Sequence, residues 1–137
     1  MLVVGHLKQR HLESDIRCDR ASVLGNPFEL INEESRPAVL AAHKAYLKLV
    51  IKHKNSGFGH LVVEPSQVGV IDIPTSEKWK RPTVDEIISA LENLVPKYKS
   101  ERVYRLMCWC RRDDAENNLP ACHCDSVIAC IKKWSEK

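Results

Sequence analysis

Cysteine and histidine side chains gather near the end of this 137-residue chain, where five of the six cysteines fall in the last 30 positions. Cys108 and Cys110 flank Trp109, and Cys122 directly precedes His123. Thiolates and imidazoles are preferred zinc ligands, and they also act as nucleophile and base in catalysis. A chain of this length buries a sufficient core without disulfides or metals. The clustering therefore indicates a site rather than a device for folding.

The expected location of the protein is cytoplasmic. The apolar stretch before Gly5 is four residues long, which is too short for the core of a signal peptide. Cysteines in a reducing compartment remain thiols. Their clustering then favours metal binding or thiol chemistry over disulfides.

The first interpretation of the cluster is a zinc site. Cys108, Cys110, Cys122 and His123 supply four ligands, with Cys124 as the alternative to the histidine. Zinc ribbons and fingers favour two residues between paired cysteines, whereas one residue separates the first pair here. In a strand, however, Cys108 and Cys110 share a face, so both can point to one metal ion.

The second interpretation is nucleophilic or redox chemistry. A thiolate at Cys110 or Cys122 would attack, His123 would act as the base, and Asp125 or Asp114 would orient the imidazole. Residues that are adjacent on a helix rarely face one another, so the cysteine and the histidine are not a preformed pair.

The third interpretation is packing alone, because free cysteines are among the most buried residue types. Cys130 fits this interpretation, since it lies one turn from Val127 and Trp134. Cys18, which stands alone upstream, fits it too. Packing gives no reason, however, for a histidine and an aspartate beside the clustered thiols.

The elements that must position the cluster are a strand and a helix. Val103–Trp109 alternates in the manner of a strand, with Leu106 and Cys108 on one face. The last helix is expected to start near Asp125 as its N-cap and to bury Val127, Ile128, Ile131 and Trp134. Sites in α/β domains lie where strands end and helices begin, and a helix N-terminus lowers the pKa of a thiol.

Two further helices are expected upstream. The first follows the N-cap Ser35, with Pro37 in its first turn and apolar positions at helical spacing on one face. It ends at residues 55–57. The second starts with a capping box of Thr83 and Glu86 and is ended by Pro96. The apolar positions of the two helices are Val39, Leu40, His43, Tyr46, Leu47, Val50, Ile51, Val84, Ile87, Ile88, Leu91, Leu94 and Val95.

Short β-branched stretches predict strands at Leu2–Val4, Leu61–Val63 and Val68–Ile73, whereas Lys8–Arg20 is expected to be a loop. Strands that alternate with helices favour an α/β fold. We therefore expect residues 1–137 to form a single compact domain with a small, at least partly parallel sheet flanked by about three helices.

Composition excludes several classes of protein. Hydrophobic residues make up 44% and charged residues 28% of the chain, which excludes a disordered protein. No apolar run approaches the 18 residues of a membrane span. The net charge of +3 is mild. Nucleic acid is not a favoured partner, because the stripe of Lys44, Lys48, Lys52 and Lys54 is not interleaved with aromatic residues. His43, on an apolar face, is expected to be a core residue.

Several fragments, in order, resemble a known family. They are the turn Leu24–Phe28, an amphipathic helix led by Arg36, the Cys108–Cys110 strand end, and Cys122 with His123 and Asp125 two residues later. This order resembles small proteins of phages, bacteria and some eukaryotes that share a numbered domain of unknown function. The resemblance covers about residues 20–53 and 102–134, and residues 57–82 have no recognised counterpart.

Two features depart from that family. The loop from Arg111 to Ala121 is longer here, and Cys124 stands where the family has a small residue. The resemblance therefore makes Cys124 a weaker ligand candidate than His123.

What the resemblance implies is a site for a small anionic ligand. Its signature positions correspond here to Asn26, Arg36, Cys108, Cys110, Cys122, His123 and Asp125. An arginine in the first turn of a helix suits a phosphate, and the turn at Gly25–Pro27 could bring the backbone close to it. The alternative for this turn is a tight loop without a ligand.

The sequence thus supports two functions. The first is a domain whose cysteine and histidine site, holding zinc or reactive thiols, lies beside a bound nucleotide-like anion that it binds and could process. Asn26, Arg36 and Asp125 would hold the anion, and Cys108, Cys110, Cys122 and His123 the metal. The second is a zinc-stabilised module that binds a protein without catalysis, such as a phage factor that binds a host protein.

Overall fold

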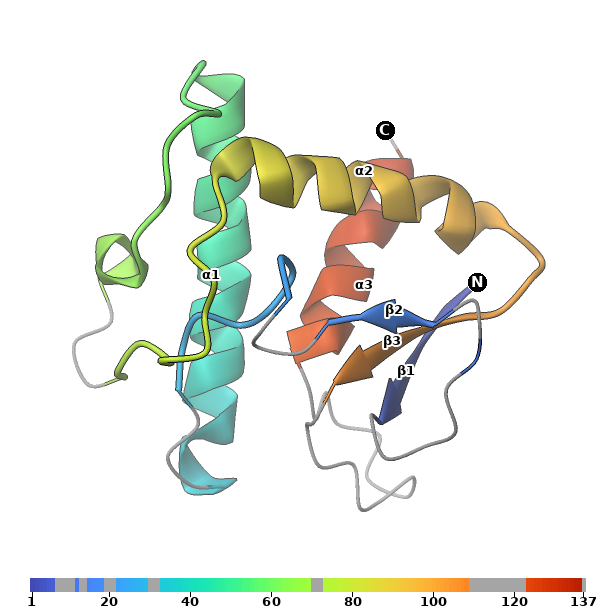
Figure 1. Ribbon diagram of the computed structural model, residues 1–137, viewed down its shortest axis with the longest axis horizontal. Coiled ribbons are helices and arrows are strands. Elements are labelled where there is room, and N and C mark those ends of the chain that lie inside the picture. The colour runs from blue at the N-terminus through green and yellow to red at the C-terminus, as the bar shows by residue number, and fades with distance from the viewer. Residues whose placement is uncertain are drawn as a thin grey trace.

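The computed structural model describes residues 1–6, 12, 15–18, 22–29, 33–69, 73–108 and 123–136. Its described part contains three strands, three α-helices and two short 3-10 helices, drawn in Figure 1. In chain order these are β1 (Leu2–His6), β2 (Ile16–Arg17), η1 (Glu33–Ser35), α1 (Arg36–Asn55), η2 (Pro65–Val68), α2 (Val84–Lys99), β3 (Tyr104–Cys108) and α3 (His123–Ser135). The expected α/β class is confirmed.

The sheet has the strand order β1-β3-β2, and both pairings are parallel. Leu2 pairs with Tyr104, and Ile16 pairs with Leu106. Parallel neighbours need long crossover connections, and α1 and α2 lie between β2 and β3 in the chain. The prediction of a loop over residues 8–20 is wrong at β2, because two residues are too few to form a recognisable alternation.

Helix α1 begins as predicted and buries the predicted face. Its first position is Arg36, followed by Pro37, which is tolerated there because the first N–H groups of a helix have no intrahelical partner. Ser35 precedes the helix, but its side chain does not cap it, because η1 already leads into the helix with helical backbone angles. The buried residues of the helix are Val39, Ala42, His43, Tyr46, Leu47 and Val50.

Helix α2 begins at the predicted capping box. The Thr83 hydroxyl accepts from the Glu86 N–H at 3.2 Å, and the Glu86 carboxylate accepts from the Thr83 N–H at 3.0 Å. The prediction that Pro96 ends the helix is wrong, since the helix continues to Lys99. Pro96 is exposed, so water can bond the carbonyl oxygen that loses its N–H partner there.

The strand predicted over Leu61–Val63 is wrong. That segment is irregular and runs to the start of α2, where the Leu61 carbonyl accepts from the Val84 N–H at 2.8 Å. A β-branched run forms a strand only where a neighbouring strand offers a partner. The strand predicted over Val68–Ile73 is also wrong at Val68, which lies in η2, and residues 70–72 are outside the described part.

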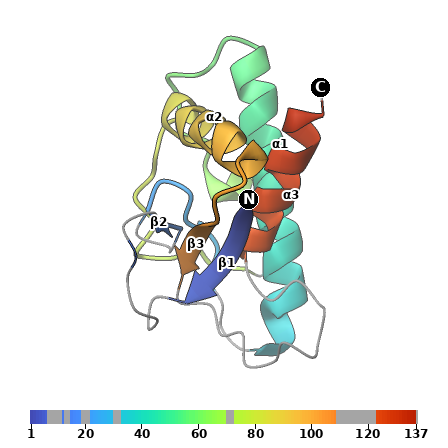
Figure 2. The ribbon, with the colours of Figure 1, turned by 90° about the vertical axis from the view of Figure 1, so that its right-hand side faces the viewer.

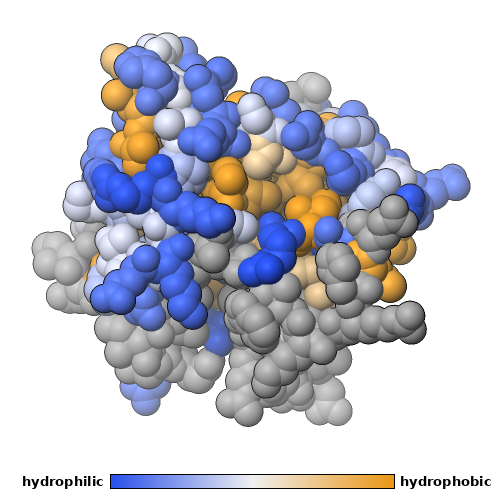
Figure 3. Space-filling model, in the orientation of Figure 1, coloured by the Kyte–Doolittle hydropathy of each residue, from blue (hydrophilic) through white to orange (hydrophobic). Residues whose placement is uncertain are grey.

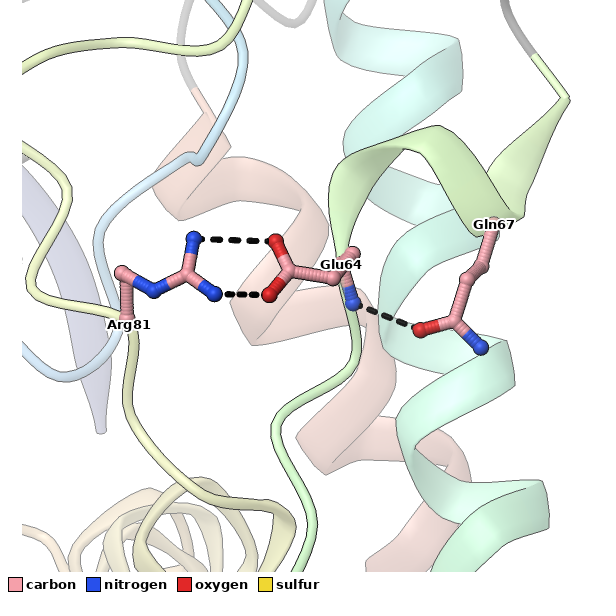
Figure 4. Close-up of polar contacts among 3 residues, drawn as sticks. All are labelled: Glu64, Gln67 and Arg81. Atoms are coloured by element: carbon pink, nitrogen blue, oxygen red, sulfur yellow. Dashed lines mark hydrogen bonds and ion pairs between the residues drawn. The ribbon is translucent and has the colours of Figure 1, made fainter.

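The N-terminus of η2 is held by polar contacts of Glu64, the residue before it, as Figure 4 shows. Arg81 donates from Nη1 to Glu64 Oε2 at 3.0 Å, and its Nη2 bonds the other carboxylate oxygen. The Glu64 N–H donates to the Gln67 side chain at 2.7 Å. These contacts join the segment before η2 to the one before α2.

Helix α3 joins the sheet to the other two α-helices within one hydrophobic core. It contacts β1 and β3 of the sheet, and it also packs against α1 and α2. Figures 1 and 2 together show α3 beside α1, with α2 crossing both. Its first turn lies at the carboxyl end of β2, because His123 contacts the carbonyl of Cys18, the residue that follows this strand. On the face seen in Figure 3, hydrophilic side chains divide the apolar surface of the coloured residues into separate patches.

Among the described residues, no helix combines the length and the apolar character that crossing a membrane requires.

Candidate metal centre

Three possible metal ligands meet in the core. One ligand atom each from Cys18, His123 and Cys124 lies within 4.8 Å of the other two. Their exposed fractions are 0%, 1% and 0%. Within the described part of the chain, this is the one group of three or more such side chains close enough to hold a metal ion.

Cys18 reaches the cluster from the sheet. It directly follows β2, and its N–H donates to the Met107 carbonyl at 2.7 Å, which continues the pairing of β2 with β3 by one bond. The carboxyl end of a strand in a parallel sheet is where α/β proteins place their sites. The thiol of Cys18 faces inward and contacts the Leu24 carbonyl at 3.9 Å.

His123 and Cys124 reach the cluster from the first turn of α3. Although they are adjacent on a helix, His123 Nε2 and Cys124 Sγ lie only 3.9 Å apart. Tetrahedral zinc, with bonds of about 2.0 Å to nitrogen and 2.3 Å to sulfur, separates such ligands by about 3.5 Å. The observed spacing is close to that of a coordinated pair.

The contacts of the cluster suit an exchange of protons for a metal ion. His123 Nε2 lies against the Cys18 carbonyl oxygen, and Cys124 Sγ lies 3.8 Å from the same oxygen. A carbonyl oxygen only accepts, so Nε2 carries a proton in this arrangement. A metal ion at these atoms would displace the protons of all three ligands, and the two thiols, as weak hydrogen-bond donors, would give up little in the exchange.

A second histidine packs on the first. His43 of α1 is 1% exposed, and its ring meets that of His123 edge-on, with the ring centroids 5.4 Å apart. The prediction that His43 is a core residue is confirmed. Its position restricts the rotation of the His123 ring, because the two rings fill adjacent space between α1 and α3.

Of the four predicted metal ligands, the structure describes the side chain of one. His123 lies in the cluster, whereas Cys110 and Cys122 are outside the described residues. Cys108 is the last residue of β3, and its side chain is also outside the described part. The metal-binding role of these three cysteines therefore stays a prediction.

Sequence reasoning misses Cys18, which it assigns to packing, and it names Cys124 only as the weaker alternative to His123, whereas the structure places all three in the cluster. No local pattern marks Cys18, because its partners lie 105 and 106 positions further along the chain. The one signal for Cys124 is its position beside His123 in the first turn of a helix.

The three residues predicted to hold an anion come from three different segments: the turn before Phe28, the start of α1 and the first turn of α3. Asn26 is 1% exposed, and its side-chain oxygen accepts from the Phe28 N–H at 2.9 Å. It thereby holds the turn that pairs Phe28 with Thr75. Arg36 is the first residue of α1 and is half-buried. Asp125 lies within the first turn of α3, not at its N-cap, since the helix begins at His123. Ligand binding by these three residues stays a prediction.

Comparison with known proteins identifies a family for this chain. The family model described as Domain of unknown function (DUF4326) matches residues 4–133, which include the segment 57–82. No curated protein and no solved structure matches the chain. The resemblance to a numbered domain of unknown function is confirmed, and this chain belongs to the DUF4326 family.

Proposed function

We propose that this protein is a zinc-binding domain in which Cys18, His123 and Cys124 hold the ion. The observation that carries the proposal is the mutual approach of these three side chains within 4.8 Å, all of them buried. Cysteine and histidine ligands select zinc over magnesium or calcium, which prefer oxygen.

The charges of the cluster suit a divalent ion. Two thiolates and one neutral imidazole carry two negative charges, which balance the two positive charges of Zn²⁺. With a third thiolate in the fourth position the complete site carries one net negative charge, far less than the thiolates would carry without the metal. Thiols without a metal are small and apolar enough to pack in a core, so the domain would also tolerate loss of the ion.

The buried position of the three ligands favours a structural role for the zinc ion. Catalytic zinc keeps an open coordination position toward a substrate, whereas structural zinc is closed by protein ligands. The three side chains are almost completely inaccessible to solvent. The ion would join the end of β2 to the start of α3 and stabilise a module that binds a protein partner. The fourth ligand would come from Cys108, Cys110 or Cys122.

The test is metal analysis of the purified protein together with cobalt(II) substitution. We expect one zinc ion per chain, and a cobalt(II) form with the absorption of a tetrahedral site and a band from thiolate ligands. Cys18→Ser and Cys124→Ser should lose the ion, whereas Cys130→Ser, a thiol outside the cluster, should retain it. The same measurement on Cys108→Ser, Cys110→Ser and Cys122→Ser identifies the fourth ligand.

The proposal fails if zinc-saturated wild-type protein retains no stoichiometric metal, or if Cys18→Ser and Cys124→Ser bind it like wild type. Circular dichroism of each variant checks that it is folded. Should the two variants unfold, the cobalt spectrum of the unaltered protein still decides, since octahedral cobalt without thiolate bands would contradict the proposed ligands.

A second candidate function is binding of a nucleotide-like anion. One observation favours it: Arg36 is the first residue of α1, where its guanidinium and the positive end of the helix can serve one phosphate. Thermal shift with nucleotides tests this function. A shift in wild type that is lost in Arg36→Ala supports it, and an equal shift in both proteins contradicts this placement of the anion.

A further inference from the structure

A groove between α1 and α3 combines an apolar floor with a basic rim. Its volume is about 260 Å³. Leu47 and Ile51 of α1 and Trp134 of α3 supply apolar surface, and Lys44, Lys48 and Lys133 supply three positive charges. None of these residues belongs to the metal cluster or to the predicted anion site, so the groove is a separate feature of the fold.

All the charged side chains among the described lining residues of the groove are positive. No aspartate or glutamate is among its described lining residues. Within the part of the chain that the structure describes, the three lysines form no ion pair, unlike Lys54, which pairs with Asp85 at 2.6 Å. Lys44 and Lys48 are four residues apart on one helix, where like charges repel. An anion would relieve that repulsion.

We propose that this groove binds a nucleoside phosphate. Three lysines match an occupant with several negative charges, and lysine serves phosphate oxygens as a point charge. The volume lies just below the lower limit of small-molecule pockets, about 300 Å³, so the groove would hold the base and its sugar while the phosphates lie outside it beside the lysines. Trp134, with the aliphatic residues, offers the base an apolar and aromatic surface. A simple carboxylate would leave most of the positive charge unmatched.

The test is calorimetric titration of the intact protein with AMP, ADP, ATP and inorganic phosphate. We expect affinity to rise from AMP to ATP and to fall with added salt, because exposed charges are screened. Inorganic phosphate should bind more weakly than any nucleotide, since it cannot use the apolar floor.

Neighbouring lysines provide matched controls. Lys133→Glu and Lys48→Glu should weaken ADP binding by about tenfold, equivalent to about 1.4 kcal/mol. Lys132→Glu and Lys52→Glu change the net charge equally but alter residues that are not among the lining ones, so they should change binding by less than about threefold. Ala129→Phe, which fills the groove without changing its charge, should abolish binding.

Four results would overturn the inference: no saturable nucleotide binding, equal effects of Lys132→Glu and Lys133→Glu, unchanged binding in Ala129→Phe, or phosphate binding as tight as that of ADP. Loss of binding in Arg36→Ala with retention in Lys133→Glu would place the nucleotide at the start of α1 and exclude the groove. None of these outcomes bears on the metal site, because metal content is measured separately.

Discussion

The imidazole of His123 meets the main-chain carbonyl of Cys18 in the core, although 105 positions separate the two residues in the sequence. The contact joins the first turn of α3 to the end of β2. It also fixes the imidazole beside the Cys124 sulfur, at 3.9 Å. The geometry of the candidate metal centre therefore depends on how two distant segments dock.

Replacement of this imidazole should destabilise the domain even without metal. His123→Ala removes the contact with the Cys18 carbonyl and the packing against His43, so we expect the free energy of unfolding to fall by about 2–3 kcal/mol. Urea denaturation in the presence of a chelator measures it. His60→Ala, at an exposed position, should change the value by less than about 0.5 kcal/mol. Equal effects of the two substitutions would contradict a structural role for His123.

The ion pair of Asp15 and Arg105 should contribute more to the stability of the fold than the ion pair of Asp85 and Lys54. Arg105 donates to the Asp15 carboxylate from Nε and Nη2, both at 2.8 Å, and the Asp15 side chain is 1% exposed. Hydrogen bonding to Asp15 raises the pKa of Arg105 above its ordinary value. Asp15→Asn would leave the guanidinium without its counter-charge. We expect a clear fall in the midpoint of thermal unfolding.

Asp85→Asn is the matched control for that pair. The Lys54 and Asp85 side chains are 46% and 53% exposed, so water and salt screen their interaction. We expect a much smaller fall in the thermal midpoint, and one that shrinks further in high salt. If Asp85→Asn destabilises the protein as much as Asp15→Asn, burial is not the reason why the Asp15 pair is important.

Removal of the Tyr46 hydroxyl should not weaken the fold. Within the described part of the chain this buried oxygen has no hydrogen-bond partner, whereas the ring packs edge-on against Phe28 and Trp79. Tyr46→Phe keeps the ring and removes a buried polar atom. We expect the free energy of unfolding at pH 7 to stay equal or to rise by about 1 kcal/mol, measured by urea denaturation. A fall of that size would contradict the prediction.

The same tyrosine should make the fold sensitive to alkali. Burial, and secondarily the charge of Glu64, raise the pKa of Tyr46 well above its ordinary value of 10.0. The folded protein therefore keeps the phenolic proton above pH 10, while the unfolded chain loses it. Below pH 10 this group does not change the free energy of unfolding. Above pH 10 it lowers that free energy by about 1.4 kcal/mol per pH unit, until the tyrosine of the folded protein also ionises. Tyr46→Phe should remove this slope, and Tyr98→Phe should retain it.

The capping box of α2 should contribute measurably to stability. Thr83→Ala removes the side-chain oxygen that accepts from the Glu86 N–H, so we expect a loss of about 1 kcal/mol in the free energy of unfolding. Ser89→Ala, at an exposed position within the same helix, is the control and should be neutral within about 0.5 kcal/mol. A neutral Thr83→Ala would show that Glu86 or solvent satisfies the helix start without Thr83.

The helices and the parallel sheet could be predicted because their signals are local. The buried face of α1 repeats every three or four residues, and the two residues of the α2 capping box are three positions apart. The alternation of strands and helices favours a parallel arrangement, and all described strand pairs are parallel. The predicted end of α2 at Pro96 is wrong, because this proline removes one hydrogen bond without breaking a helix whose backbone reaches water there.

Strands without a strong local pattern depended on the tertiary structure. Leu61–Val63 has the composition of a strand but pairs with no other strand in the described part of the chain. Conversely, β2 has two residues and forms because β3 offers it an edge. Pairing with a partner, rather than composition, decides whether a short segment becomes a strand.

The sequence by itself determined that this protein has an α/β fold, with a surplus of thiols and a histidine near its last helix. Only the tertiary structure decided which described side chains can share a metal ion. Cys18 lies in the candidate centre because β2 pairs with β3, and Cys124 lies in it because α3 starts at the carboxyl end of the sheet. Helical spacing and caps act over a few residues, whereas a coordination site needs atoms within a few ångströms, from segments that only folding brings together.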